Sequence, residues 1–492
     1  MLFYRGTKVS LRRVLLLLGD SACIIGALFF STWIRLGTTH AWTYLGEHVP
    51  TIAGSCVIFL VVFYAGGMYE RQPLASTAPS YALPLATVAI ALCIIVIIFY
   101  AKFQLLIGRG ILLVASLIIF LGTWTMRKLY RVAVGYGFLS KNTLIVGEGK
   151  EAEEVVTLLA NTEDTGFKLF GIVASKGARP GEFIEGIPIL GDIEKLREFV
   201  DVYAIETIIV ASSLVKENSI LGILRPLRYS GVQILDYVAL YEELVHEIPL
   251  DHINDEWLTH AAMNSSVIHI RKIKRIMDFS VATVGLILSA PICIVTAIII
   301  RLDSSGPVLF RQRRAGLDEN VYTLYKFRTM KQDAEAESGA VWAGRYDSRV
   351  TRVGRFLRKW RIDEVPQLIN VLKGEMSLVG PRPERPEFID SLASAIPFYK
   401  ERLMVPPGVT GWAQVKFPYA ASVDAARRKF QYDLYYIKHM SFFLDVLVLL
   451  RTFKTIIIGI RYDEIGDEES PSPPILSLLS SDSDDADATK SA

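Results

Sequence analysis

The sequence predicts a multi-domain membrane protein with two α/β parts, and three observations predict this fold class. The chain of 492 residues is 51% hydrophobic and only 21% charged. Four early apolar runs each approach the roughly 20 residues that a membrane-spanning helix needs. After residue 141, buried-strand patterns alternate with helical ones. We therefore expect, in order, an N-terminal four-helix transmembrane bundle (1–140), a central Rossmann-like α/β domain (141–245), a linker (246–268), a C-terminal α/β domain with a re-entrant membrane helix and interfacial amphipathic helices (269–465), and a disordered acidic tail (466–492).

The N-terminal apolar runs cover about 14–34, 49–69, 81–101 and 107–126. Basic residues decide their orientation, because lysine and arginine stay on the cytoplasmic side. Arg35 is the only lysine or arginine in the first loop, whereas clusters flank the whole set: Arg5, Lys8, Arg12 and Arg13 before it, and Arg127, Lys128, Arg131 and Lys141 after it. Both ends of the bundle are therefore expected in the cytoplasm. Asp20 lies inside the first run, and we interpret it as a side chain that snorkels to the nearby interface rather than as a functional site.

The middle of the chain is typical of a small parallel α/β domain. Strand patterns occur at 142–146, 206–212 and 231–237, with helical stretches between them. A GxGxxA pattern of Gly147, Gly149 and Ala152 follows the first strand and resembles a dinucleotide fingerprint. No acidic residue ends a strand about 20 positions further on, as that fingerprint requires. Nucleotide binding therefore stays open, and we favour a structural or assembly role.

A fifth apolar run, about 276–300, is long enough to cross a membrane but is flanked by basic residues on both sides. Pro291 lies within it, where proline removes a helical hydrogen bond. We therefore predict a re-entrant helix over about 274–302, broken at Pro291, that returns to the side from which it entered. The apolar stretch 442–460 contains Asp445, Arg451 and Lys454, so we expect it to lie in the membrane interface. The four cysteines all fall in apolar runs, without metal-ligand or disulfide spacing.

The segment between these two membrane-contacting pieces is rich in arginine and contains an adjacent carboxylate pair, Asp363 and Glu364. The pattern predicts a helix with Pro366 in its first turn, Gly374 as its stop and Asp363 as its N-cap. Capping alone is an ordinary use of such a pair. Because a helix N-terminus and nearby guanidinium groups attract phosphate and favour an ionised carboxylate, the context predicts phosphoryl transfer. Asp363 is then the nucleophile and Glu364 a magnesium ligand, with Arg382 presented by the stiff Pro381-Arg382-Pro383 element.

Residues 270–462 resemble the bacterial sugar transferases, the monotopic-type phosphoglycosyl transferases that move a hexose 1-phosphate from a nucleotide diphosphate sugar onto polyprenyl phosphate. The matching stretches are LYKFRTM (324–330), VGRFLRKWRIDEVPQLINVLKGEMSLVGPRPERPE (353–387), PGVTGWAQV (407–415) and LDVLVLL (444–450). The apolar preface and the α/β middle resemble the large members of this family. Residues 416–441 are most similar to the subgroup associated with exosortase-linked exopolysaccharide systems.

The resemblance implies that 269–465 is the catalytic domain and that the reaction has two steps. Asp363 matches the nucleophile that displaces UMP and holds the sugar phosphate, and Glu364 matches the magnesium-binding partner. The substrate-binding positions of the family match Lys326, Arg328, Arg358, Pro381, Arg382 and Pro383, and the helix break matches Pro291. The implied partners are a UDP-sugar, undecaprenyl phosphate, Mg²⁺, the lipid bilayer and a second copy of the chain, with no nucleic acid. The implied location is the bacterial inner membrane, multi-pass, with a cytoplasmic catalytic domain.

Two departures and two alternatives accompany the resemblance. The helix break is Ala290-Pro291 where many relatives have Ser-Pro, and Trp360 stands where a small hydroxyl residue is common. Trp360 leaves the identity of the sugar open among galactose, glucose and N-acetylated sugars. Direct attack by polyprenyl phosphate, without a covalent intermediate, is one alternative. A non-enzymatic membrane scaffold or nucleotide sensor is the other, and it would tolerate Asp363→Asn.

Overall fold

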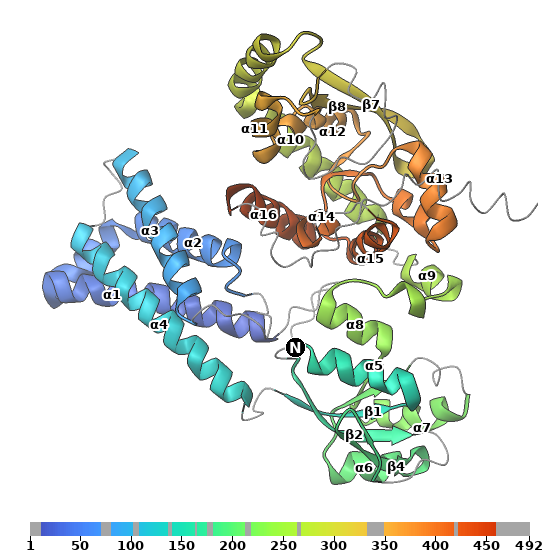
Figure 1. Ribbon diagram of the computed structural model, residues 1–492. Helices are drawn as coiled ribbons and strands as arrows, with labels where there is room; N and C mark the ends of the chain where they lie inside the picture. Colours follow the sequence, from blue (N-terminus) through green and yellow to red (C-terminus); the bar gives the residue numbers. More distant parts are fainter. Residues whose placement is uncertain are drawn as a thin grey trace, which may run out of the picture. The chain divides into compact units, whose positions relative to one another are not determined.

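The computed structural model describes residues 11–69, 80–101, 108–135, 140–162, 165–174, 181–211, 218–262, 267–331, 349–417 and 422–458 (Figure 1). The chain divides into two units, Met1–Val245 and His246–Ala492. The expected acidic tail over 466–492 lies outside the described residues.

Four apolar helices begin the first unit: α1 (Leu11–Glu47), α2 (Val49–Ala65), α3 (Ala82–Ala101) and α4 (Arg109–Gly135). They share one core in which Phe59, Phe63, Ile95 and Ile119 are fully buried. By length and composition, α1 and α4 can cross a membrane, whereas α2 and α3 are shorter apolar helices. The four N-terminal apolar helices are thus present as expected, and their passage through a bilayer stays a prediction.

The interpretation of Asp20 as a snorkelling side chain is wrong. Asp20 is completely buried, and its two carboxylate oxygens accept hydrogen bonds of 2.9 and 2.8 Å from the guanidinium of Arg127 on α4. A buried carboxylate must be paired, and the planar guanidinium satisfies both of its oxygens at once. This ion pair therefore fastens the first helix of the set to the fourth.

A parallel sheet forms the rest of the first unit. Its strand order is β3-β4-β2-β1-β5-β6, with every pair parallel except the antiparallel edge pair β3–β4. The strands are β1 (Lys141–Val146), β2 (Phe167–Ala174), β3 (Phe183–Ile184), β4 (Ile187–Asp192), β5 (Thr207–Val210) and β6 (Gln233–Asp236), and the helices are α5 (Gly149–Ala160), η2 (Ile193–Lys195), α6 (Leu196–Val202), α7 (Asn218–Tyr229) and α8 (Tyr237–Val245). The order around β1 is that of a Rossmann-type half, which confirms the predicted α/β domain.

The glycines that follow β1 serve close packing in this sheet. A Cβ at Gly147 would lie 2.6 Å from the Cβ of Ala211, which follows β5. Gly149 has a φ of 59°, in the left-handed region that favours glycine. Ala152 of α5 is fully buried in a core with Ile145 and Ile172. The GxGxxA pattern is therefore explained by packing at Gly147 and Ala152 and by backbone conformation at Gly149.

The second unit begins with η4 (Leu250–His252), α9 (Asp255–Ala262) and the long α10 (Val267–Asp303), followed by the antiparallel hairpin of β7 (Leu309–Ala315) and β8 (Val321–Phe327). The remaining elements are η5 (Leu317–Glu319), α11 (Arg352–Lys359), η6 (Ile362–Glu364), α12 (Gln367–Lys373), β9 (Ser377–Val379), α13 (Pro386–Ala395), η7 (Tyr399–Met404), β10 (Gly408–Thr410), α14 (Trp412–Lys416), α15 (Val423–His439) and α16 (Phe442–Ile458). Their main core surrounds Val371, Trp412, Tyr436 and Val448.

The segment expected as a linker, 246–268, is largely folded into this unit. Ile248 and Leu250 are buried in one core with Phe430 and Leu434 of α15. The linker prediction failed there because two buried aliphatic side chains in a polar stretch are too few to produce a periodic signal.

Helix α10 contains Pro291 and packs against the second unit along both of its halves. In the first half, Asp278 accepts hydrogen bonds from the Ser377 hydroxyl (2.7 Å) and the Leu378 amide (3.1 Å). In the second half, Ile300 shares a small core with Phe327 and Leu357. The opposite face is apolar and uncovered in the protein, with Leu288 73% exposed.

Helix α16 also departs from expectation at its acidic residue. Asp445 was expected to point toward water from an interfacial helix, but it is buried and accepts a hydrogen bond of 2.6 Å from Lys274 of α10. The Tyr436 hydroxyl donates a second one of 2.7 Å. The charge is compensated inside the unit, so it does not set the depth of α16 in a membrane.

Candidate active site

The carboxylate pair lies in a short turn rather than at a helix cap. Arg361 has a φ of 56° in the left-handed region, and the turn Ile362–Glu364 follows it. Pro366 occupies the N-cap position of α12 without a side-chain cap, so the expectation of Asp363 as N-cap is wrong. Gly374 ends α12 with a φ of 86°, as predicted. The left-handed residue Arg361 separates the carboxylate turn from α11, which precedes it, and no sequence period encodes this conformation.

Glu364 is the centre of a cation cluster. It is 8% exposed, and its carboxylate lies 3.3 Å from the Lys326 ammonium, 3.2 Å from the Arg361 guanidinium and 3.3 Å from the Arg382 guanidinium. Burial alone would raise the pKa of Glu364, but these three cations outweigh it and hold the pKa well below its ordinary range. Glu364 is therefore an ionised acceptor at neutral pH.

Asp363 has the opposite environment, although it is the neighbouring residue. It is 7% exposed, and its Oδ1 atom is buried without a hydrogen-bond partner. Burial and the charge of Glu364 raise the pKa of Asp363, against the lowering effect of nearby cations. The expectation that guanidinium groups and a helix dipole favour the ionised form is therefore not met. An unsatisfied buried carboxylate oxygen is costly and marks a position where a ligand can bind or react.

The basic residues predicted for this site divide into two groups. Lys326 on β8 and Arg382, which follows β9, both contact Glu364. Burial lowers the pKa of Lys326. Arg361 joins them, and sequence reasoning placed it only in the general basic segment; its position two residues before Asp363 was the available signal. Pro381 and Pro383 flank Arg382 as expected.

Arg328 and Arg358 make other contacts. The Arg328 guanidinium donates to the Ser304 carbonyl (2.7 Å) and hydroxyl (3.0 Å) and to the Ser305 carbonyl. It thereby fastens β8 to the end of α10. Arg358 donates to the Thr329 hydroxyl (2.9 Å), and its charge lowers the pKa of Asp363. Arg358 therefore belongs to the electrostatic surroundings of Asp363, whereas Arg328 supports the structure.

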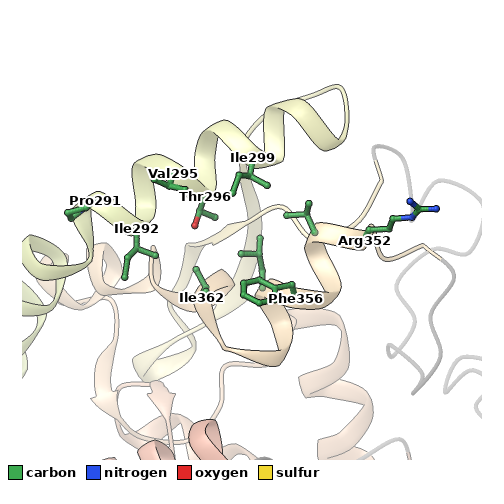
Figure 2. Close-up of a pocket in the computed structure, with 10 residues that line it drawn as sticks. Pro291, Ile292, Val295, Thr296, Ile299, Arg352, Phe356 and Ile362 are labelled. Carbon is green, nitrogen blue, oxygen red and sulfur yellow. The ribbon is translucent and has the colours of Figure 1, made fainter. Parts of the chain in front are cut away.

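An apolar cavity of about 580 Å³ lies beside the carboxylate turn, between the second half of α10 and α11 (Figure 2). Figure 2 shows Val295 and Ile299 on α10 above Phe356 on α11, with Ile362 beside Phe356. The cavity is lined by Pro291, Ile292, Val295, Thr296, Ile299, Arg352, Val353, Phe356, Leu357 and Ile362. Because Ile362 directly precedes Asp363, the cavity adjoins the turn that carries Asp363.

The second unit of the chain matches a known protein family. The family model described as bacterial sugar transferase matches residues 269–459. A UDP-glucose:undecaprenyl-phosphate glucose-1-phosphate transferase of Caulobacter vibrioides is 41% identical over 186 residues, which are 37% of this chain and 69% of the relative. The chain belongs to the bacterial sugar transferase family. The region matched by the family model contains the carboxylate turn, the cation cluster and both walls of the cavity.

Other relatives match different lengths of the chain. A UDP-N-acetylgalactosamine-undecaprenyl-phosphate N-acetylgalactosaminephosphotransferase of Aeromonas hydrophila is 46% identical over 218 residues, 44% of this chain and 51% of the relative. An undecaprenyl-phosphate glucose phosphotransferase of Komagataeibacter xylinus is 32% identical over 321 residues, 64% of this chain and 59% of the relative. The matches thus span only half to three-fifths of these two relatives. A model described as a CoA-binding domain matches residues 65–236.

Proposed function

We propose that this sugar transferase moves a sugar 1-phosphate from a UDP-sugar to undecaprenyl phosphate and releases UMP, as the first step of an exopolysaccharide or another surface glycan. The observation that carries the proposal is the unsatisfied Asp363 oxygen beside an ionised Glu364 that has three cationic neighbours. The reactions in the names of the relatives support the same substrates. The homodimer implied by the family resemblance stays a prediction.

The proposed chemistry uses Asp363 as the nucleophile. A carboxylate oxygen of Asp363 attacks the phosphorus that carries the sugar, and the bond from that phosphorus to the bridging oxygen breaks. UMP leaves with the bridging oxygen and its electron pair. A phosphate oxygen of undecaprenyl phosphate then attacks the same phosphorus, and the bond to Asp363 breaks to restore the carboxylate. Lys326, Arg361 and Arg382 bind the diphosphate oxygens and stabilise their charge.

The carboxylate pair also fits the magnesium ion that the resemblance implies. The donors are hard oxygens, and the unpartnered Oδ1 of Asp363 lies next to Glu364. Magnesium is commonly held by one or two carboxylates and completed by substrate phosphates, which a single carboxylate pair can provide. Magnesium would be held by Glu364 and would neutralise charge on the diphosphate.

The cavity beside α11 offers a place for the acceptor's hydrocarbon chain. Its walls are almost entirely apolar, and two of its lining residues on α10, Ile292 and Val295, are 53% and 55% exposed. An isoprenoid chain there would place its terminal phosphate toward Ile362 and hence toward Asp363. We propose that the first isoprene units of undecaprenyl phosphate occupy this cavity.

We further propose that α10 enters and leaves the inner membrane on the cytoplasmic side. Both halves of α10 pack against the same catalytic unit, around Asp278 and around Ile300. A helix that crossed the bilayer would carry its second half away from that unit. Membrane-impermeant thiol labelling of Leu302→Cys is the test, because a residue near the end of a re-entrant helix reacts only from the cytoplasm. Labelling from the periplasm would refute this topology.

The proposed reaction is tested with purified full-length protein. A panel of UDP-sugars, each with undecaprenyl phosphate and Mg²⁺, is offered, and UMP release is measured; one sugar is expected to support turnover. With a substrate labelled in the phosphate next to the sugar and no acceptor, wild type should retain label on the protein, and Asp363→Asn should retain none and turn over at least about 10³-fold more slowly. Activity without retained label would favour direct attack by the acceptor. No UMP release with any sugar would favour a scaffold.

A further inference from the structure

The segment that carries Arg382 is held almost entirely by its carbonyl groups. Two of its residues are prolines and have no N–H group to donate. Four consecutive carbonyls accept hydrogen bonds from three other segments: Pro381 from the Gly408 amide (2.8 Å), Arg382 from the Arg402 guanidinium (3.0 Å), and Pro383 and Glu384 from the Arg314 guanidinium and the Ala315 amide of β7 (3.0 Å each). Side-chain guanidinium groups thus hold the two central carbonyls.

Arg402 is the more deeply buried of these two arginines, at 6% exposure. The Arg402 nitrogen that donates to the Arg382 carbonyl also donates to Asp433 on α15, at 2.9 Å. Its other terminal nitrogen donates to the Tyr399 hydroxyl and lies 3.9 Å from Glu384. Asp433 is also buried. The guanidinium is therefore fixed on several sides and cannot follow the loop if the loop moves.

Among the contacts that the described residues make, only Arg382 connects Arg402 to the site. The carbonyl of Arg382 is bonded to Arg402, and its side chain is bonded to Glu364 at 3.3 Å. One residue thus links the buried ion pair to the proposed magnesium ligand. A shift of the carbonyl would move the guanidinium by a similar distance, and displacements near 1 Å lower catalytic rates strongly.

We propose that Arg402, oriented by Asp433, is a positioning residue that fixes the Arg382 backbone and so aims the Arg382 guanidinium at the sugar diphosphate. This role rests on the proposed function, because it acts on the binding of that substrate. Arg402 itself touches neither Asp363 nor Glu364 in the contacts that the structure gives.

The test is a double-mutant cycle on the full-length enzyme, with the UDP-sugar that wild type accepts. Asp433→Asn keeps the side-chain shape but removes the charge that orients Arg402, and Arg402→Lys keeps a charge but loses the fork that bonds two acceptors. Each should lower kcat/KM for the UDP-sugar by about 10-fold, as supporting groups around a site commonly do. In an Arg382→Ala background, each substitution should lower kcat/KM by less than about 2-fold further, because the guanidinium of Arg382 through which it acts is already absent.

The control is Arg427→Gln, also on α15, which breaks an exposed ion pair with Asp251 and should leave kcat/KM unchanged. If Arg402 had a merely structural role, each substitution would lower kcat/KM by the same factor with and without Arg382→Ala. That result would overturn the inference. So would normal kcat/KM in Asp433→Asn. If thermal unfolding shows that one variant does not fold, the other decides the cycle; if neither folds, Arg402 is structural and the inference is wrong. Absence of wild-type turnover would instead reject the proposed function.

Discussion

The second unit contains two charged clusters that differ in how completely their groups are paired. The outer cluster consists of Asp363, Glu364, Lys326, Arg361 and Arg382, and the inner cluster consists of Arg402, Asp433, Tyr399 and Glu384. In the outer cluster the arginine side chains of residues 361 and 382 are 34% and 38% exposed, and an Asp363 oxygen has no partner. In the inner cluster the side chains of Arg402 and Asp433 are 6% and 3% exposed and bonded to each other.

The difference shows how one unit separates reactivity from support. Buried polar groups are normally paired, so an unpaired one is retained only where something else completes it. The outer cluster has accessible cations and a free carboxylate oxygen, which suits an anionic substrate. The inner cluster has its contacts supplied by the protein itself, which suits a rigid support. Substitutions in or beside each cluster test this difference.

After the loss already predicted for Asp363→Asn, the largest effect is expected at Glu364. Glu364→Gln removes the charge that pairs with Lys326, Arg361 and Arg382 and that we propose binds magnesium. UMP release should fall by at least about 100-fold, and the Mg²⁺ concentration for half-maximal rate should rise. The measurement is a magnesium titration of UMP release.

Glu319→Gln is the matched control for that titration, because Glu319 is an exposed glutamate paired with Lys400. It should behave as wild type. If Glu364→Gln lowered the rate but left the magnesium dependence unchanged, Glu364 would not be the metal ligand, and its part would be limited to holding the cations.

A smaller and more selective effect is expected at the apolar cavity that adjoins the outer cluster only. Val295→Trp should fill the cavity and raise KM for undecaprenyl phosphate by about 10-fold, because several apolar contacts with the chain are lost. The KM for the UDP-sugar should not change. Ile298→Trp is the control, since Ile298 lies on α10 with the same 55% exposure but does not line the cavity. Equal effects of both variants would place the acceptor chain elsewhere.

The sequence predicted those parts of the fold that depend on local pattern. Apolar runs predicted the helices α1 to α4 and α10, and short aliphatic runs predicted β1, β5 and β6. The carboxylate pair and Arg382 stood out because several charges share a short segment. These signals are readable because hydrophobic period and residue type act within a few residues.

The remaining features depend on contacts between residues far apart in the chain. Asp20 pairs with Arg127, which is 107 residues away in the sequence, and Asp445 pairs with Lys274, which is 171 residues away. Asp363 was wrongly predicted to be a helix N-cap, because the left-handed backbone conformation of Arg361 cannot be read from hydrophobic periodicity. Arg328 was expected at the site because it matches a substrate-binding position of the family, but side-chain direction follows from packing. Arg402 gave no signal, since its role depends on a carbonyl contact.

The smallest effect is expected in the pH dependence of the inner cluster. Burial raises the pKa of Asp433 to about 6, with Glu384 acting in the same direction and Arg402 and Lys429 opposing it. Asp433 therefore loses its charge as the pH falls through about 6, and protonated Asp433 then resembles asparagine. The ratio of kcat/KM between wild type and Asp433→Asn should be largest near pH 7.5 and shrink to about 2-fold or less near pH 5.

A ratio of two variants cancels the titration of groups that both share, including Asp363. The two variants are compared only up to about pH 7.5, because burial lowers the pKa of Lys429, which faces Asp433, to about 8. Asp433→Glu keeps a titratable carboxyl group and should show a pH dependence like that of wild type. If the ratio of kcat/KM between wild type and Asp433→Asn stayed constant from about pH 5 to 7.5, the charge of Asp433 would not orient Arg402. The inner cluster would then support the loop by shape alone.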